Sequence, residues 1–315
     1  MNRCRLFTGL LATMSAVIVF GCDSASKTTD LKLGLKEGKT YRTRMVVDQD
    51  VKQTMMGQSM DMKQKMTQDL AFEVRDVDEK GNLTVRVTFE RIAADIEAGP
   101  RKMTYDSAQP ADDTNPLAKS YGVMAGQGYT LVVSDRGQLV AISGMDSLIN
   151  RMIDKMEIDD ESMKERMKAQ FESAYGEQSA RDMCGQMFGM IPPGPVEVGD
   201  QWSCSSSGKM MFPITWDQTW VLKEIRGDVM VLDGQSATSI HSGDEPTEMG
   251  PVKMLMDMDG TQSGTLELDR DTGLVIGGTM HSSMKGEQRF VDGPPQIKGQ
   301  TVPVEMEQTI TWQPL

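Results

Sequence analysis

Hydrophobic and polar residues alternate with a period of two over long stretches of the first third of the chain. Between residues 59 and 75 the odd positions are mostly charged or hydroxylic, and most even positions are apolar. Residues 41–55 alternate in the same way, and Gly57 with Gln58 marks a turn between the two segments. Successive side chains of a β-strand point to opposite faces of a sheet. The pattern therefore predicts a long β-hairpin with one polar face and one apolar face.

The apolar positions of this hairpin carry an unusual number of methionines. Five of the twelve residues 55–66 are Met, and the chain contains 28 Met, more than its Phe, Trp and Tyr together. The methionine side chain is flexible and polarisable, so it fits irregular apolar surfaces and ligands. We expect one apolar sheet face to carry Met45, Met55, Met60, Met62 and Met66 from this hairpin, joined by Met254, Met256, Met258, Met280 and Met284 from later strands.

A third strand follows, and its pattern changes phase. Leu83, Val85 and Val87 occupy odd positions, whereas Ile92 and Ala94 occupy even ones. A change of one residue is what a β-bulge produces, so we expect a bulge near Arg91. Strands of about fifteen residues are far longer than usual and suit a strongly curved sheet.

Residues 146–190 have a helical period instead. Leu148, Ile149, Met152 and Ile153 fall on one stripe of a helix, and the sequence IPPGP at 191–195 ends this region. Alternating segments then resume to the C-terminus. The fold class expected is mainly β (α+β): a long-stranded antiparallel meander that forms a curved sheet, half-barrel or barrel, with a helical insert near 146–190.

The alternating segments form two groups that are similar in kind and order. TLVVSDRGQLV at 130–140 is similar to TLELDRDTGLV at 265–275. We therefore expect a single β-rich domain over 39–315, built of similar halves at 39–144 and 198–315. The alternative is that the two segments are similar only because antiparallel meanders with similar turns have similar sequence patterns.

The N-terminus has the pattern of an export signal. Arg3 and Arg5 precede an apolar run over 6–20, which is too short for a comfortable membrane span. The run ends in VFGC, which resembles a bacterial lipobox with Cys22 as the lipidated residue. We expect residues 1–21 to be a signal peptide and 22–38 a lipidated flexible tether, because the latter residues are small and polar. The protein would be exported and anchored by lipid to a bacterial membrane, on the periplasmic side; the alternative is an ordinary secretory signal with an incidental cysteine.

Charge argues against two classes of partner. The formal net charge is −13, and it becomes −15 if Arg3 and Arg5 leave with the signal. Such a surface disfavours nucleic acid and anionic lipid headgroups. The acidic residues are interspersed with basic ones, which is typical of a solubilising surface.

Two cysteines remain after Cys4 and Cys22 are set aside. In an exported chain, Cys184 and Cys204 favour one disulfide, which would close a loop of about twenty residues. The alternative is two separate buried thiols.

No catalytic motif is present in the sequence. The two histidines, His241 and His281, have no metal-ligand spacing, and there is no nucleophile elbow or phosphate-binding glycine loop. We expect no enzyme activity, no cofactor and no metal. A minor alternative is Cu(I) held by methionines that converge from adjacent strands.

Several stretches resemble a family of uncharacterised exported β-rich lipoproteins common in planctomycetes. They are GKTYRTRM at 38–45, VDEKGNLTVRVTFERI at 77–92, YDS at 105–107 and IPPGPVEVGDQW at 191–202. The resemblance implies export and a β-rich fold, and it implies no catalytic residue because the family has no assigned activity. In outline the expected architecture also resembles the half-barrel lipoprotein carriers of the bacterial envelope.

Two functional hypotheses follow. In the first, the methionine-rich face binds acyl chains or another apolar ligand beside the membrane. In the second, the protein is a structural or interaction module with a closed core and an envelope protein as its partner.

Overall fold

The computed structural model describes residues 3–6, 28–55, 58–110, 114–156, 160–209, 212–249 and 252–315. Its strands are β1 (Arg3–Leu6), β2 (Thr40–Met55), β3 (Gln58–Val77), β4 (Leu83–Ala98), β5 (Arg101–Asp106), β6 (Gly128–Val133), β7 (Leu139–Ser143), β8 (Gln201–Lys209), β9 (Pro213–Arg226), β10 (Val229–His241), β11 (Thr247–Met249), β12 (Val252–Asp269), β13 (Val275–Asp292) and β14 (Thr301–Pro314). Its helices are α1 (Pro116–Tyr121), α2 (Met145–Lys155), α3 (Glu161–Tyr175) and α4 (Glu177–Met187).

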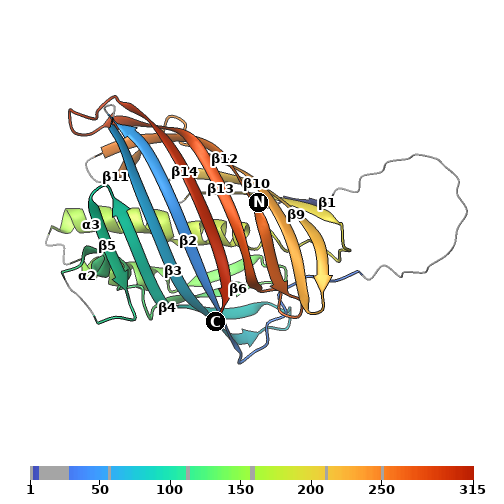
Figure 1. The fold of residues 1–315 in the computed structure, drawn as a ribbon. Coiled ribbons are helices and arrows are strands. Elements are labelled where there is room, and N and C mark those ends of the chain that lie inside the picture. Colours follow the sequence, from blue (N-terminus) through green and yellow to red (C-terminus); the bar gives the residue numbers. More distant parts are fainter. Residues whose placement is uncertain are drawn as a thin grey trace, which may run out of the picture.

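The strands form one antiparallel sheet that does not close. Its order is β1-β8-β9-β10-β12-β13-β14-β2-β3-β4-β6-β7, with β5 and β11 paired at its sides. In this order the C-terminal strands β8 to β14 come before the N-terminal strands β2 to β7. The two groups are joined where β14 pairs with β2. Figure 1 shows the sheet curving around the helices, which lie on its concave side. The curved antiparallel meander with a helical insert is confirmed, and the open half-barrel is the form that it takes.

The predicted bulge is also confirmed. Pairing of β3 with β4 shifts register between Asp69 and Leu70, so that Leu70 faces Phe89 while Asp69 faces Arg91. The shift keeps both apolar halves of β4 on one face, because one extra residue reverses the direction of every side chain after it.

Helices α1 and α3 begin at residues whose side chains cap them. Asp160 accepts hydrogen bonds from the backbone N–H groups of Ser162 and Met163 and so caps α3. Asn115 caps α1 in the same way, with a proline at the first helical position. Helix α1 and strand β5 were not predicted from the sequence.

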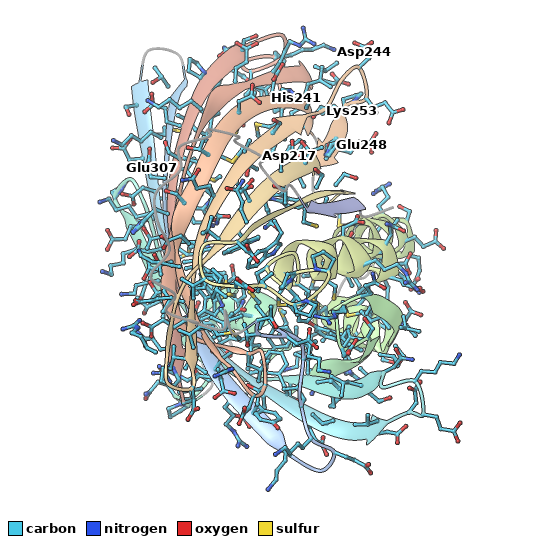
Figure 2. The ribbon with its side chains drawn as sticks, turned by 90° about the vertical axis from the view of Figure 1, so that its right-hand side faces the viewer. Asp217, His241, Asp244, Glu248, Lys253 and Glu307 are labelled. Atoms are coloured by element: carbon cyan, nitrogen blue, oxygen red, sulfur yellow. The ribbon has the colours of Figure 1, made fainter. Side chains whose placement is uncertain are left out.

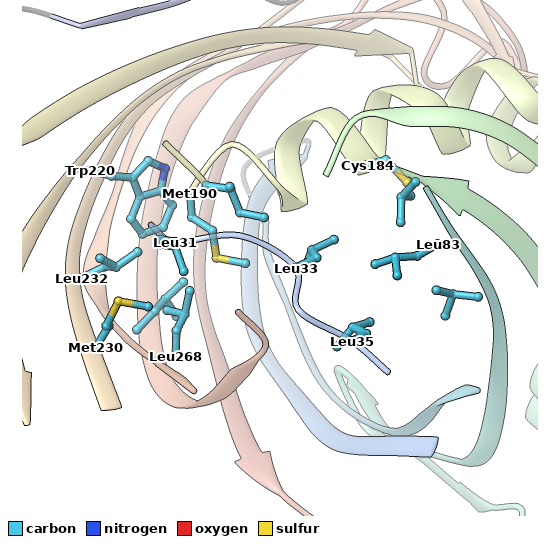
Figure 3. Packing of buried hydrophobic residues seen from close by; sticks show 14 of the residues in the cluster. Leu31, Leu33, Leu35, Leu83, Cys184, Met190, Trp220, Met230, Leu232 and Leu268 are labelled. Carbon is cyan, nitrogen blue, oxygen red and sulfur yellow. The ribbon is translucent and has the colours of Figure 1, made fainter. Parts of the chain in front are cut away.

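The main core lies between the lower part of the sheet and the segment 28–36. Leu31, Leu33 and Leu35 of this segment are buried, at 0%, 4% and 7% exposure, among the apolar side chains of the sheet and Met190 (Figure 3). Backbone hydrogen bonds join Thr29 to Val196.

The prediction of a flexible tether over 22–38 is therefore wrong from residue 29 onward. Backbone hydrogen bonds run from Leu33 N–H to the Asp135 carbonyl and from Gly34 N–H to the Thr272 carbonyl. The Arg136 guanidinium also binds the Leu31 carbonyl at 2.9 Å and the Asp30 carboxylate at 2.6 Å. Leu31, Leu33 and Leu35 alternate as in a β-strand and belong to the main core. The polar composition of the residues around them makes this pattern hard to recognise in the sequence.

Of the expected signal peptide, Arg3–Leu6 forms β1, which pairs with β8 at the edge of the sheet. The rest of it lies outside the described residues, as do Cys22 and the tether up to residue 27.

Within the described part of the chain, none of the helices is both long enough and apolar enough to span a bilayer.

Candidate functional site on the inner face of the sheet

The concave side of the sheet, which we call the inner face, carries no charge over its central strands. All charged residues of β2, β12 and β14 occupy the alternating positions that face outward, and the same holds for Gln58–Val74 of β3 and Val275–Phe290 of β13. A protein with a net charge of −13 thus has a large neutral surface on one side of its sheet. Such a surface suits apolar or uncharged ligands, because ions would lose hydration there without gaining a counter-charge.

A row of glutamines and serines crosses the middle of the inner face. The strand registers place its members directly opposite one another on seven consecutive strands: Gln218, Ser236, Gln262, Ser282, Gln308, Gln49 and Gln64. Gln218 and Ser236 are buried, at 5% and 6% exposure, and the others are partly buried. We call this set the polar row. It separates the main core on one side from a second apolar cluster on the other.

The second cluster is rich in methionine. It consists of Val51, Met258, Met284 and Val304, with Ile240, Met256 and Met306 packed against them. Met62 lies opposite Val51 in the register, and Met60 lies opposite Gln53. We call these nine residues the methionine patch. The Gln49 side-chain amide donates to the Met306 sulfur at 2.8 Å, which ties the polar row to the patch.

The predicted methionines share the inner face but differ in exposure. Met258, Met280 and Met284 are buried; Met45, Met66, Met254 and Met256 are partly buried. Met60 and Met62 are exposed, at 51% and 36%. The side chain of Met55 lies outside the described part of the structure, although its backbone pairs with Gln58.

The helices cover only part of the inner face. Figure 2 shows them beside the lower part of the concave surface, while the upper part of the sheet extends beyond them. Among the described residues, no helix contributes to the methionine patch. The helices therefore leave Met60 and Met62 uncovered, at 51% and 36% exposure.

The polar row ends at four buried polar atoms that have no hydrogen-bond partner within the described residues. They are Trp202 Nε1, Ser206 Oγ, Gln218 Oε1 and Trp220 Nε1. All four belong to β8 and β9, where Trp202 lies opposite Trp220 and Ser206 lies opposite Trp216. The Trp220 ring leans over Gly234 of β10, where any Cβ would collide with it. The sequence did not reveal this group, because only the pairing of β8 with β9 brings its members together.

The predicted disulfide is wrong: the structure does not join Cys184 to Cys204, and both thiols are buried. Asp182 of α4 faces β8, since a Cβ on Gly208 would come 2.7 Å from the Asp182 Cβ. A residue two positions further along a helix lies about 200° around its axis, so Cys184 points away from β8 and Cys204. It packs instead toward Tyr129, on the side of Leu83 (Figure 3), where burial raises the pKa of the Cys184 thiol to about 11.

The structure also separates the methionines that a copper site would need. Four strand spacings, or about 19 Å along the sheet, lie between Met60 and Met62 on β3 and Met254 to Met258 on β12. His281 faces outward and its Nδ1 lies 3.0 Å from Thr309 Oγ1. Among the described residues, Met256 and Met258 are the two of these methionines that share the second apolar cluster.

The outer face is polar and rich in ion pairs. A depression of about 630 Å³ lies over β14, β2 and β3 and is lined by side chains such as Arg44, Asp48 and Lys65. Arg44, one of its lining residues, donates two hydrogen bonds to Asp69, of 2.6 and 2.7 Å. Beside it Arg91 binds Asp106 at 2.9 and 2.7 Å, and these hydrogen bonds lower the Asp106 pKa to about 2.

One group of described residues has the ligand types of a metal site: His241, Asp257 and Asp259, all exposed on the outer face. His241 Nδ1 lies 2.7 Å from Asp257 Oδ1, and Nε2 lies 3.4 Å from Asp259 Oδ1. Both ring nitrogens thus have carboxylate partners, and the group is explained as a surface cluster of hydrogen bonds and charges.

Several solved structures match the chain at low identity. A lipovitellin structure is 8% identical, with a TM-score of 0.44, and the match covers 87% of this chain. The chain spans about a quarter of lipovitellin, 25% of its length. The β domain of the Bordetella autotransporter BrkA and Salmonella typhi OmpF in complex with daunomycin are each 8% identical, with TM-scores of 0.23, and each match covers 87% of this chain. These matches cover 100% and 98% of the two proteins, and none of the three is similar enough to support a functional argument.

No curated protein matches the sequence. A family model does match over residues 80–275, which is more than half of the chain and includes β4, the helices and the strands up to β12. The chain therefore belongs to a family of unknown function, DUF6263.

Proposed function

We propose that this protein is an exported, membrane-tethered, non-catalytic binder of acyl chains or a similar apolar ligand, which lies on the methionine patch. The observation that supports the proposal most is the exposure of Met60 and Met62, at 51% and 36%, on an uncharged sheet face. Exposed apolar residues that adjoin a larger apolar cluster are typical of an interaction surface.

The composition of the patch favours a flexible ligand over a rigid one. Its side chains are methionine and branched aliphatic residues, and aromatic side chains are not among them. Methionine has three rotatable bonds and adapts its shape to a neighbour that has no single conformation. An alkyl chain is such a neighbour.

The anchor would keep this surface close to the membrane. Five residues lie between Cys22 and Thr28, so six Cα–Cα steps join them, and the main core begins at Leu31. Even a fully extended connection of that length spans only about 20 Å. A lipid on Cys22 would therefore hold the domain near the bilayer surface, within reach of its acyl chains.

Lipid analysis of the purified protein tests the proposal. The protein with Cys22→Ser carries no acyl chain of its own, so any lipid extracted with organic solvent and detected by mass spectrometry must be bound non-covalently. We expect acyl-containing lipid at a level near one molecule per protein. The double variant Met60→Asp/Met62→Asp places two charges on the inner face and should lose most of it.

Val198→Asp is the matched control, because Val198 is 57% exposed in the turn before β8 and lies outside the patch. It should retain the lipid. Protein that is folded and free of lipid in every preparation would contradict the proposal.

The second candidate is an interaction module for an envelope protein. It is favoured by the main core, in which the segment 28–36 and Met190 fill the lower part of the inner face. A photo-reactive residue at position 60 would then cross-link to one defined protein in cells, and no lipid would be extracted.

A further inference from the structure

Four buried polar atoms without a hydrogen-bond partner in the described structure lie at one end of the polar row. Trp202, Trp220 and Gln218 are exposed by only 1%, 5% and 5%, and Ser206 by 8%. Two indole N–H groups, one amide oxygen and one hydroxyl therefore lie on two adjacent strands without partners in the described structure. Buried polar groups in proteins are almost always hydrogen-bonded, so an arrangement of four in one place points to a bound polar group.

The chemistry of these atoms selects an uncharged partner. Indole nitrogens donate, the amide oxygen accepts and the hydroxyl does either, so together they match an ester, an amide or an alcohol. Among the described residues of the central strands, every lysine and arginine faces outward, and the carboxylate of Asp182 lies close to Gly208 of β8. A phosphate or carboxylate would lose its hydration here without a counter-ion from the described part of the sheet face.

The position of these atoms relative to the methionine patch suits an amphipathic molecule. Gln218 lies opposite Ser236, and Ile240 of the patch lies four residues further along β10. Residues two apart on a strand are separated by about 6.7 Å, so Gln218 is about 13 Å from Ile240 along the strands, and Trp220, opposite Gly234, is about 20 Å from it. A long alkyl chain that starts at the polar row would use most of its length to reach Ile240, the patch residue on β10, and would end on the patch.

We infer that the ligand has an uncharged hydrogen-bonding head, of the ester or alcohol class, which binds at Trp202, Gln218 and Trp220 while its alkyl chain lies on the methionine patch. This inference rests on the proposed function and adds the class of head group. The polar row gives the site its selectivity for neutral over anionic lipids.

The test compares a monoacylglycerol with the fatty acid of the same chain length at pH 8, using the protein with Cys22→Ser after removal of bound lipid. We expect the monoacylglycerol to bind about tenfold or more tightly, because the carboxylate loses its hydration without a partner. Gln218→Leu should weaken monoacylglycerol binding about tenfold and leave the binding of an uncharged apolar fluorescent dye unchanged.

Gln235→Leu is the matched control, since it makes the same change at an exposed position on the outer face of β10. A second variant, Trp220→Phe, removes one unpartnered donor and keeps an aromatic ring. It should weaken monoacylglycerol binding without lowering the melting temperature of the lipid-free protein, a combination that a purely structural role would not give.

The outcomes separate the two proposals. Equal affinity for both lipids, or monoacylglycerol binding that Gln218→Leu leaves unchanged, overturns the inference on the head group while the binding function stands. Failure of both lipids and the dye to bind overturns the proposed function as well.

Discussion

The side chain of Met284 lies across Gly260, its direct partner on the neighbouring strand β12. A Cβ added to Gly260 would come 2.5 Å from Met284 Cγ and would also collide with the Ser283 carbonyl oxygen. The same relation holds between Met280 and Gly264, where a Cβ would come 2.9 Å from the sulfur. The inner face thus holds buried methionines flat against the sheet because the opposing residues have no side chains.

This packing predicts the effect of a small substitution. Gly260→Ala should lower the free energy of unfolding by about 1–3 kcal/mol, because neither the backbone nor the buried methionine can move away freely. Urea denaturation measures the change. Gly194→Ala is the control: a Cβ there meets no atom within 4 Å and should change stability little. Equal effects of the two substitutions would contradict the packing of Met284 over Gly260.

The segment 28–36 provides a second prediction. Leu33→Ala should destabilise the protein by about 2–5 kcal/mol, since Leu33 is 4% exposed in the main core. Leu315→Ala makes the same change where the side chain is 53% exposed and should have little effect. Chemical denaturation distinguishes the two. If Leu33→Ala is as mild as Leu315→Ala, the segment is a tether after all.

The strands could be predicted from the sequence because each one has a single apolar face. Alternation gave the hairpin of β2 and β3 and the bulge near Arg91, since both depend on residues close in sequence. The segment 28–36 was missed although Leu31, Leu33 and Leu35 alternate, because small polar residues surround them and composition outweighed the pattern.

The candidate site was predicted only in part, for a different reason. The methionines recur within single strands, so their common face is visible in the sequence. The polar row has one member on each of seven strands, and only the register between distant strands, such as Gln308 opposite Gln49, aligns them. The disulfide failed because its geometry depends on which side of α4 carries Cys184, and this is fixed by tertiary packing.

A third prediction concerns stability at acid pH. The hydrogen bonds from Arg91 lower the Asp106 pKa from 3.8 to about 2, which is equivalent to a stabilisation on the order of 2 kcal/mol. A carboxyl with a lowered pKa stabilises the folded state above pH 3.8, and this contribution disappears as the pH falls toward 2. Asp106→Asn should therefore destabilise the protein at pH 7, and the difference from the unmodified protein should shrink between about pH 4 and pH 2.

Urea denaturation across this pH range measures that difference. Asp244→Asn, at an exposed position after β10, is the control and should change stability by less than about 0.5 kcal/mol. A difference for Asp106→Asn that stays constant down to pH 2 would show that the pair with Arg91 does not set the pKa of Asp106.

The buried thiol of Cys184 gives the last prediction. Its pKa is raised from 9.0 to about 11, because burial disfavours the thiolate. At pH 8 this lowers the reactive thiolate fraction about a hundredfold, and limited access lowers the rate further. Iodoacetamide should thus modify Cys184 at least about a hundredfold faster in denaturant than in the native protein. Peptide mapping without reduction should recover Cys184 and Cys204 on separate peptides, because Cys184 faces Tyr129 and not β8; a linked peptide would contradict this orientation of α4.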